Sequence, residues 1–301
     1  MANRKACYGS NKAFAADMKK MVNNPLLSDV QFVVGEERKQ VFGHKSILSP
    51  RCEVFKAMFA QASDSKPKLE NGAHVFVLSD TQPHIFLAVI EFIYTNRCYL
   101  DACNVTDVLT AAVEYGIEDL KKLCIDFFKS TLTVDTVCEA LQAAISYNNS
   151  DLKKTCLGFV ERNTLGVFKS RTFVEMSEES LSYILQSDKL KADESEVLNA
   201  VKEWCTVNAV ITGQSMKDVA RKVIGHVRFS LLDPEYLSLV EKENELKPFI
   251  PIRLLSEAWR SHALQDKDSN NPQLRPRAGT HPHDSLARKL ARSQGCRTAE
   301  D

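Results

Sequence analysis

Residues 25–59 read PLLSDVQFVVGEERKQVFGHKSILSPRCEVFKAMF, and this stretch decides the fold of the first half of the chain. Apolar side chains within 30–34 are spaced by two, which is the side-chain period of a β-strand. A turn at 35–37 follows, and 40–42 returns as a second short strand. The pattern therefore predicts a β-hairpin that leads into helical sequence.

Helical patterns surround this hairpin. Residues 46–60 place apolar side chains on one face, with an interruption predicted at Ser49-Pro50. A third short strand is predicted at 74–78, and Pro83 suits the first turn of the helix that follows it. The other predicted helices of this half cover 12–24, 104–115 and 117–130. We therefore expect a small sheet flanked by helices.

The second half of the chain has a different pattern. From Thr131 onward no strand pattern is found, and amphipathic helices follow one another to about residue 262. Asp193 and Glu196 have the spacing of a capping box at a helix start. Residues 263–301 are poor in large apolar side chains, so we expect this tail to be disordered.

Composition limits the functional class. The 301 residues carry 39 basic and 39 acidic side chains, so the net charge is zero and a strongly basic nucleic-acid binder is excluded as a first interpretation. No run of 18 apolar residues is present, so we expect no membrane span. The nine cysteines are irregularly spaced, which is typical of a reducing compartment. We expect a cytoplasmic protein.

Catalytic and cofactor motifs are not found. The sequence has no phosphate-binding glycine loop, no His-Glu-x-x-His and no nucleophile elbow, so we expect no enzyme activity, no cofactor and no metal. His44 and Cys52 are close in sequence, and such a pair can act as base and nucleophile. We favour a structural role for His44 over a catalytic one.

The decisive stretch resembles the BTB/POZ domain. The motifs that carry the resemblance are Asp29, His44-Lys45, Leu48-Ser49 with Cys52, and Phe55-Lys56-Ala57-Met58-Phe59. Further matches follow in order at 75–78, 92–95 and 111–115.

The second half resembles the BACK domain that follows BTB in Kelch-like proteins, through pieces within 180–190, 195–204 and 227–232. No Kelch repeats follow it. Together the two resemblances imply an α+β BTB/POZ domain, with a short mixed sheet flanked by helices, followed by an all-α BACK helical array. The domains are expected at 1–24 (a segment with a dimerisation helix), 25–130 (BTB/POZ), 131–262 (BACK) and 263–301 (tail).

The resemblance implies a homodimer with an isologous interface. The expected interface residues are Phe14, Met18, Met21 and Leu26, although packing within one chain is the alternative interpretation of the same side chains. Asp29 and Lys45 are expected to form a buried charged pair under the dimer seam. In some relatives such a pocket supports corepressor binding, but a structural role is favoured here.

The resemblance also implies an adaptor that recruits an unidentified client protein to a cullin-3 ubiquitin ligase. The expected cullin face comprises Met58, Phe59, Ala62, Tyr115 and Glu118. An apolar-x-Glu motif that strong binders carry after the Ala-Met-Phe step is missing from this sequence, and buried anchors of that kind carry much binding energy. The alternative is a BTB–BACK scaffold that pairs with itself or other BTB proteins without a cullin.

Two basic motifs in the tail, Arg275-Pro276-Arg277 and the run at 287–292, offer a further alternative. They match a nuclear address or a weak partner site. Most such charge runs are merely solvated.

Overall fold

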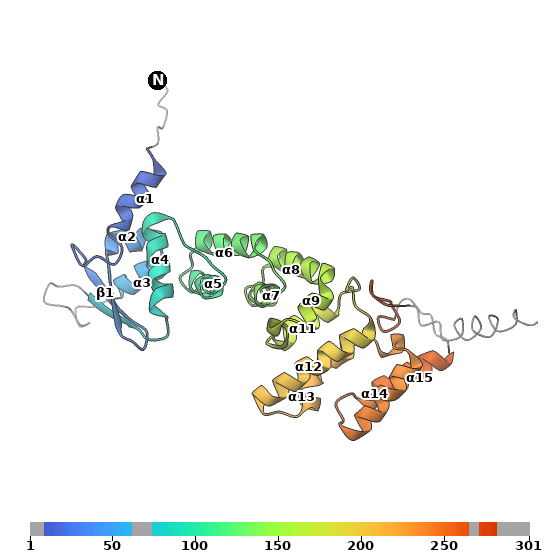
Figure 1. The fold of residues 1–301 in the computed structure, drawn as a ribbon. Coiled ribbons are helices and arrows are strands. Elements are labelled where there is room, and N and C mark those ends of the chain that lie inside the picture. Colours follow the sequence, from blue (N-terminus) through green and yellow to red (C-terminus); the bar gives the residue numbers. More distant parts are fainter. Residues whose placement is uncertain (1–8, 62–73, 265–270, 282–301) are drawn as a thin grey trace, which may run out of the picture. The chain divides into compact units, whose positions relative to one another are not determined.

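The computed structural model describes residues 9–61, 74–264 and 271–281. The chain forms two compact units, Met1–Thr131 and Leu132–Asp301, and Figure 1 follows their elements in chain order. The first unit combines a sheet with helices, and the described part of the second contains helices without strands. The predicted fold class is therefore confirmed for both halves.

The sheet of the first unit has three strands, namely β1 (Val30–Val34), β2 (Lys39–Gly43) and β3 (His74–Leu78), in the order β2-β1-β3. β1 is antiparallel to β2 and parallel to β3. The predicted hairpin, third strand and mixed sheet are therefore confirmed. Gly35 begins the hairpin turn with φ +72°, and a Cβ there would lie 2.9 Å from Pro83 Cδ, so only glycine fits.

Six helices are described in the first unit: α1 (Asn11–Lys19), α2 (Lys45–Arg51), α3 (Glu53–Ala60), α4 (Pro83–Thr95), α5 (Val105–Glu114) and α6 (Glu118–Ser130). Two predicted boundaries were wrong. α1 ends at Lys19 instead of residue 24, because the chain then turns and Asn23 adopts a left-handed φ of 51°. The break between α2 and α3 falls at Cys52, whose backbone is extended, so Pro50 lies inside the last turn of α2.

Aromatic side chains form the core of the first unit. Phe32 projects from β1 and is fully buried. Its ring lies 5.0 Å from that of Phe86 on α4 and 5.5 Å from that of Phe55 on α3. Phe55 in turn stacks on Tyr115 at 5.0 Å. The sheet and the helices therefore share one contiguous core.

The second unit contains nine α-helices and two 3₁₀ turns among its described residues. They are α7 (Val137–Ser146), α8 (Ser150–Arg162), α9 (Thr164–Phe168), α10 (Arg171–Val174), α11 (Glu178–Leu185), α12 (Glu194–Thr212), α13 (Met216–Ala220), η1 (Ile224–His226), η2 (Phe229–Leu231), α14 (Pro234–Leu246) and α15 (Ile252–Leu264). The predicted capping box of Asp193 and Glu196 is present at the start of α12. Figure 1 shows α14 and α15 side by side.

Part of the tail departs from the expectation of disorder. Residues 271–281 lie against the second unit, and Arg277 is buried with an exposed fraction of 3%. Its guanidinium forms an ion pair with Glu194 at 3.0 Å. Disorder was predicted because the tail has few large apolar side chains, but this buried ion pair holds residues 271–281 in place instead. The remaining tail residues, 282–301, lie outside the described part of the chain.

Candidate protein-interaction site

One side of α1 packs against the rest of the first unit, and the other side is exposed to solvent. Ala15 is buried, and Lys19 forms an ion pair of 2.7 Å with Glu91 of α4. Phe14 points away from this contact with 65% of its surface exposed, and Met18 is half-buried. α1 therefore uses its small side chain for packing within the chain and leaves its largest apolar side chain outside.

The loop that follows α1, residues 20–29, extends the apolar surface. Met21 lies in this loop instead of on the helix and is half-buried. Leu26 is 68% exposed, and Leu27 is 81% exposed with a left-handed φ of 61°. Sequence reasoning named Leu26 but missed Leu27, although the consecutive leucines between Pro25 and Ser28 were the available signal. We call Phe14, Leu26 and Leu27 the N-terminal apolar patch.

Hydrogen bonds hold this loop in place. His44 is buried, and its Nε2 lies 3.1 Å from the Leu26 carbonyl oxygen while its Nδ1 lies 2.9 Å from the Tyr94 hydroxyl. Since a carbonyl can only accept, Nε2 carries the proton and the Tyr94 hydroxyl donates to Nδ1. The Leu26 amide also donates to Asn24 Oδ1 at 2.9 Å. The loop is therefore tied to the core through His44.

This arrangement also tests the catalytic alternative for His44 and Cys52. The Cys52 thiol donates to the Tyr115 carbonyl at 3.2 Å, and burial raises its pKa. A raised pKa disfavours the thiolate that nucleophilic catalysis needs. With both nitrogens of His44 bound to Tyr94 and Leu26, the two side chains have structural contacts.

The predicted pair of Asp29 and Lys45 is corrected by the structure. Asp29 is exposed, and its carboxylate accepts the Lys45 backbone N–H at 2.7 Å at the start of α2. The Lys45 ammonium instead lies 2.8 Å from His74 Nδ1 and 5.7 Å from the centre of the Phe59 ring. Asp29 thus serves a helix N-terminus, where a carboxylate is favoured by the free backbone N–H groups, and no buried charged pair exists at this place.

The predicted cullin face is brought together only in part. Met58 and Phe59 are half-buried on α3, and Glu118 is exposed at the start of α6. Tyr115 is 7% exposed and stacks on Phe55, so it is a core residue, and burial raises its pKa to about 12. Ala62 lies outside the described residues.

Two exposed valines lie close in sequence to the buried Phe55–Tyr115 stack. Val54 on α3 is 37% exposed and Val113 on α5 is 36% exposed. Val54 precedes Phe55 directly, and Val113 lies two residues before Tyr115. Sequence reasoning placed Val54 on the apolar face of its helix and did not select Val113. We call Val54, Met58 and Val113 the α3–α5 surface.

Within the described residues, no group of three or more His, Cys, Asp or Glu side chains is arranged to hold a metal ion. Among the same residues, none of the helices is long and apolar enough to cross a membrane.

The comparisons with known proteins agree with the two units. The family profile of the BTB/POZ domain matches residues 18–132, and the profile described as BTB And C-terminal Kelch (BACK) matches residues 137–241. Two similar proteins are BTB/POZ domain-containing protein 19 of Homo sapiens and of Bos taurus. Each is 44% identical over 278 residues, which cover 92% of this chain and 94% of the relative.

A more distant similarity extends to a longer protein. Kelch-like protein 7 of Homo sapiens is 27% identical over 289 residues. The match covers 94% of this chain but 47% of that protein, so this chain spans about half its length. Two domain profiles in the order of the two structural units, together with relatives that align over nearly the whole chain, show the family. The chain belongs to the BTB/POZ proteins, in the group that carries a BACK region after the BTB domain.

Proposed function

We propose that the protein is a non-enzymatic adaptor that forms a homodimer through the N-terminal apolar patch and joins a client protein to a cullin-3 ubiquitin ligase. The observation that carries the proposal is the patch itself. Phe14, Leu26 and Leu27 are each at least 65% exposed. The BTB–BACK architecture, with its resemblance to Kelch-like adaptors, supports the same function.

The patch favours a second copy for energetic reasons. Fully burying a large apolar side chain contributes about 1.5–3 kcal/mol. An isologous contact covers each patch residue twice, once in each copy, so six side chains would contribute to one dimer. Large apolar side chains left this exposed favour an interaction site when they gather on one surface.

Cullin binding is the less well-supported part of the proposal. The α3–α5 surface offers Val54, Met58 and Val113 as apolar contacts, with Glu118 as an acidic neighbour in the sequence after α5. The missing apolar-x-Glu motif and the burial of Tyr115 favour the second candidate function. In that case the protein is a BTB–BACK scaffold that pairs with itself or other BTB proteins.

The first experiment measures binding of the full chain to the N-terminal domain of cullin-3 by calorimetry, with light scattering for mass. The adaptor proposal expects a dimer that binds with sub-micromolar affinity, more favourable than about −8 kcal/mol. Val54→Asp should abolish that binding, and Leu246→Asp, at an 84% exposed leucine of α14, is the matched control. A folded dimer that does not bind at tens of micromolar supports the scaffold function instead.

The dimer itself is tested separately. Phe14→Asp and Leu27→Asp should convert the dimer to a monomer if the N-terminal apolar patch forms the seam. A mass that stays dimeric in both variants removes this seam from the proposal.

We also propose that the adaptor works in the cytoplasm, which microscopy of the tagged chain tests. Arg277 is buried, so Arg275-Pro276-Arg277 does not present two free arginines to an import receptor. The run at 287–292 lies outside the described residues. Deleting that run tests the nuclear alternative.

A further inference from the structure

Residues 271–281, which we call the C-terminal strap, contact the second unit in the way a bound peptide contacts a receptor. Within the strap only Arg277 is buried, and the other residues are half-buried or exposed. The strap contributes no apolar side chain to the buried core of the unit. The buried apolar core of the unit is therefore built from side chains outside the strap.

The pocket for Arg277 is built from groups that match a guanidinium. Nε donates to Glu194 Oε2 at 3.0 Å, Nη2 donates to the His226 carbonyl at 2.9 Å, and Nη1 donates to the carbonyls of Leu185 (2.8 Å) and Ser187. Glu194 Oε1 is held by the Arg228 backbone N–H at 2.7 Å. The side chains of Arg277 and Glu194 are both fully buried. The pocket thus offers one carboxylate, held in place by a backbone N–H, and three carbonyl oxygens. These acceptors match the several donors of a planar guanidinium, so the pocket selects arginine over lysine.

The backbone of the strap adds a second element of recognition. The Ala278 N–H donates to the Asp188 carbonyl at 2.9 Å, and the Gly279 N–H donates to the Leu190 carbonyl at 3.0 Å. Two carbonyls of the turn that follows α11 thus accept from consecutive strap amides, a form of main-chain recognition. A Cβ at Gly279 would lie 2.2 Å from the backbone nitrogen of Ala192, so the site accepts only glycine there.

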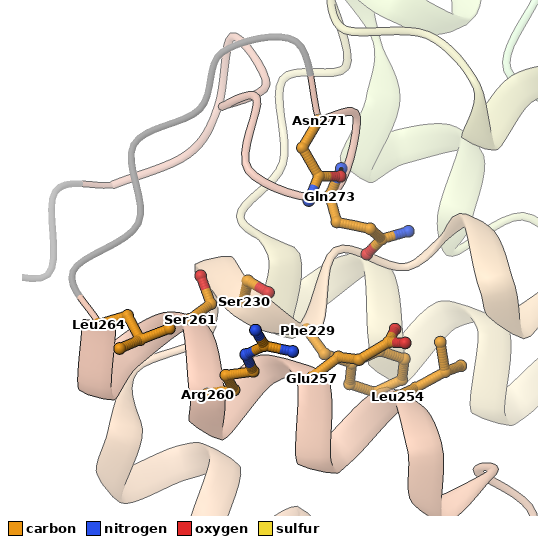
Figure 2. Close-up of a pocket in the computed structure, with 9 residues that line it drawn as sticks. All are labelled: Phe229, Ser230, Leu254, Glu257, Arg260, Ser261, Leu264, Asn271 and Gln273. Carbon is orange, nitrogen blue, oxygen red and sulfur yellow. Dashed lines mark hydrogen bonds between the residues drawn. The ribbon is translucent and has the colours of Figure 1, made fainter.

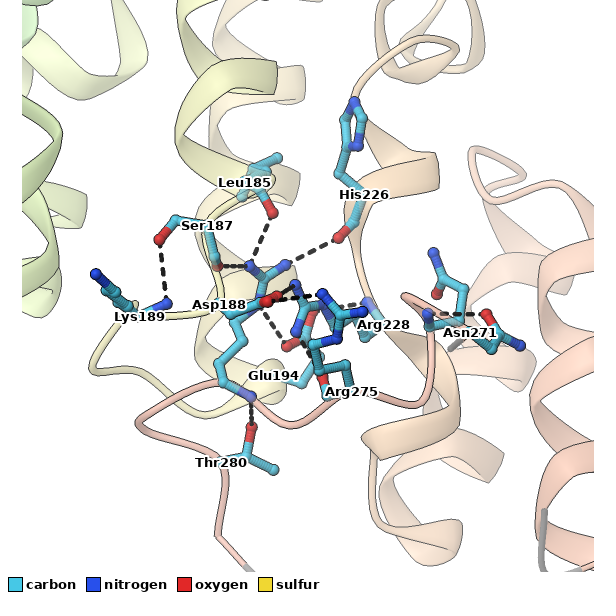
Figure 3. A network of polar contacts seen from close by, with 12 residues as sticks. Leu185, Ser187, Asp188, Lys189, Glu194, His226, Arg228, Asn271, Arg275 and Thr280 are labelled. Carbon is cyan, nitrogen blue, oxygen red and sulfur yellow. Dashed lines mark hydrogen bonds and ion pairs between the residues drawn. The ribbon is translucent and has the colours of Figure 1, made fainter. Parts of the chain in front are cut away.

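A second group of charged side chains, Asp188, Arg228 and Arg275, lies beside the pocket (Figure 3). The Asp188 carboxylate forms ion pairs with Arg228 and Arg275, and Arg275 Nη1 lies 3.1 Å from Asp188 Oδ2. Desolvation raises the pKa of the Asp188 carboxyl, but the hydrogen bonds from the two arginines lower it more, so the pKa lies below its usual value. The Arg275 side chain remains 48% exposed, so it contributes less to selectivity than Arg277.

The beginning of the strap is packed less closely. Asn271 and Gln273 form one wall of a cavity of about 410 Å³, opposite Leu254 and Arg260 of α15 (Figure 2). Gln273 makes one contact to the main chain of the unit, from Nε2 to the Gly225 carbonyl at 2.8 Å. Recognition is therefore concentrated in residues 275–280.

We propose that the second unit contains an arginine-peptide binding site around Glu194 that recognises an Arg-x-Gly sequence, with the C-terminal strap as its resident and exchangeable ligand. Because the strap belongs to the same chain, its effective concentration is high and it normally fills the site. A peptide with the same sequence binds when the strap is released. This inference does not depend on cullin binding.

The test uses the full chain with a specific protease sequence in place of residues 265–270. After cleavage, the released C-terminal piece is removed by dilution and gel filtration. A fluorescent peptide of residues 271–281 is then titrated into the cleaved protein, with anisotropy as the readout. The Arg277→Ala and Gly279→Ala peptides are the test variants, and the Arg275→Ala peptide is the matched control.

The proposal expects that the cleaved protein stays folded and binds the peptide, and that the uncut chain does not. The Arg277→Ala and Gly279→Ala peptides should bind at least 100-fold more weakly, and the Arg275→Ala peptide less than tenfold more weakly. Three results overturn the proposal: equal binding of the Arg277→Ala peptide, a folded cleaved protein that does not bind the peptide, or unfolding upon cleavage. Unfolding would make the strap a part of the core.

Discussion

Replacing Arg277 by methionine should strongly destabilise the second unit. Methionine fills much of the same volume but leaves Glu194 buried without its partner, since both side chains are fully buried. Removing one member of a buried ion pair costs about 3–5 kcal/mol. A unit of this size shifts its melting temperature by about 2–4 °C per kcal/mol. We therefore expect Tm to fall by about 12 °C.

Tryptophan fluorescence isolates this transition, because both tryptophans of the chain, Trp204 and Trp259, belong to the second unit. Arg275→Met is the matched control. Its side chain is 48% exposed, and exposed ion pairs contribute about 0–1 kcal/mol, so we expect a loss below about 4 °C.

A second variant separates charge from packing. Glu194→Gln with Arg277→Met removes both charges and keeps an oxygen for the Arg228 backbone N–H. Because no uncompensated charge remains, the double variant should recover at least half of the lost stability. The reasoning is refuted if Arg277→Met melts within about 3 °C of the parent, or if the double variant is no more stable than Arg277→Met.

Three further predictions concern other parts of the molecule. Phe14 is 65% exposed, so Phe14→Ala should remove about 1.3 kcal/mol per copy and raise the dimer Kd about 80-fold in analytical ultracentrifugation. Val210→Ala, at an 81% exposed residue of the second unit, should leave the dimer Kd unchanged, and equal effects of the two variants would contradict the proposed seam. Burial, together with the nearby charge of Arg277, lowers the pKa of His226. The unfolded chain therefore binds the extra proton first, and the free energy of unfolding should fall as pH drops below about 6.5. His226→Gln should reduce this fall in chemical denaturation at pH 7.5 and 5.5, and an equal fall in the variant would contradict the prediction. Burial raises the pKa of Cys124 to about 12, so iodoacetamide at pH 7.5 should modify the exposed Cys103 and spare Cys124 in the native protein. Equal alkylation rates of the two cysteines, measured by peptide mass spectrometry, would contradict this prediction.

Several elements could be predicted because their signals are local. Alternation within 30–34 identifies β1, and Gly35 supplies the positive φ that the turn needs. Asp193 and Glu196 announce the start of α12 by spacing alone. Such signals lie within a few residues of the element they describe, so one sequence contains them completely.

Features that depend on distant partners could not be predicted in the same way. Arg277 is ordered by Glu194, which is 83 positions away in the sequence, and the composition around Arg277 gives no sign of it. Tyr115 was expected on a surface, but its ring completes a stack with Phe55. Asp29 was expected to pair with the Lys45 ammonium, yet it binds that residue's backbone N–H. In each case the residue was identified, and the group that it contacts was not.

The tethered loop that displays Leu26 and Leu27 has a consequence for partner choice. Its backbone is held by His44 and Asn24 before any partner arrives, so little conformational entropy is lost when it is covered. A loop of fixed shape cannot adjust to a poorly fitting surface. If this loop forms the proposed dimer seam, its fixed shape should disfavour partner chains whose surfaces do not match it.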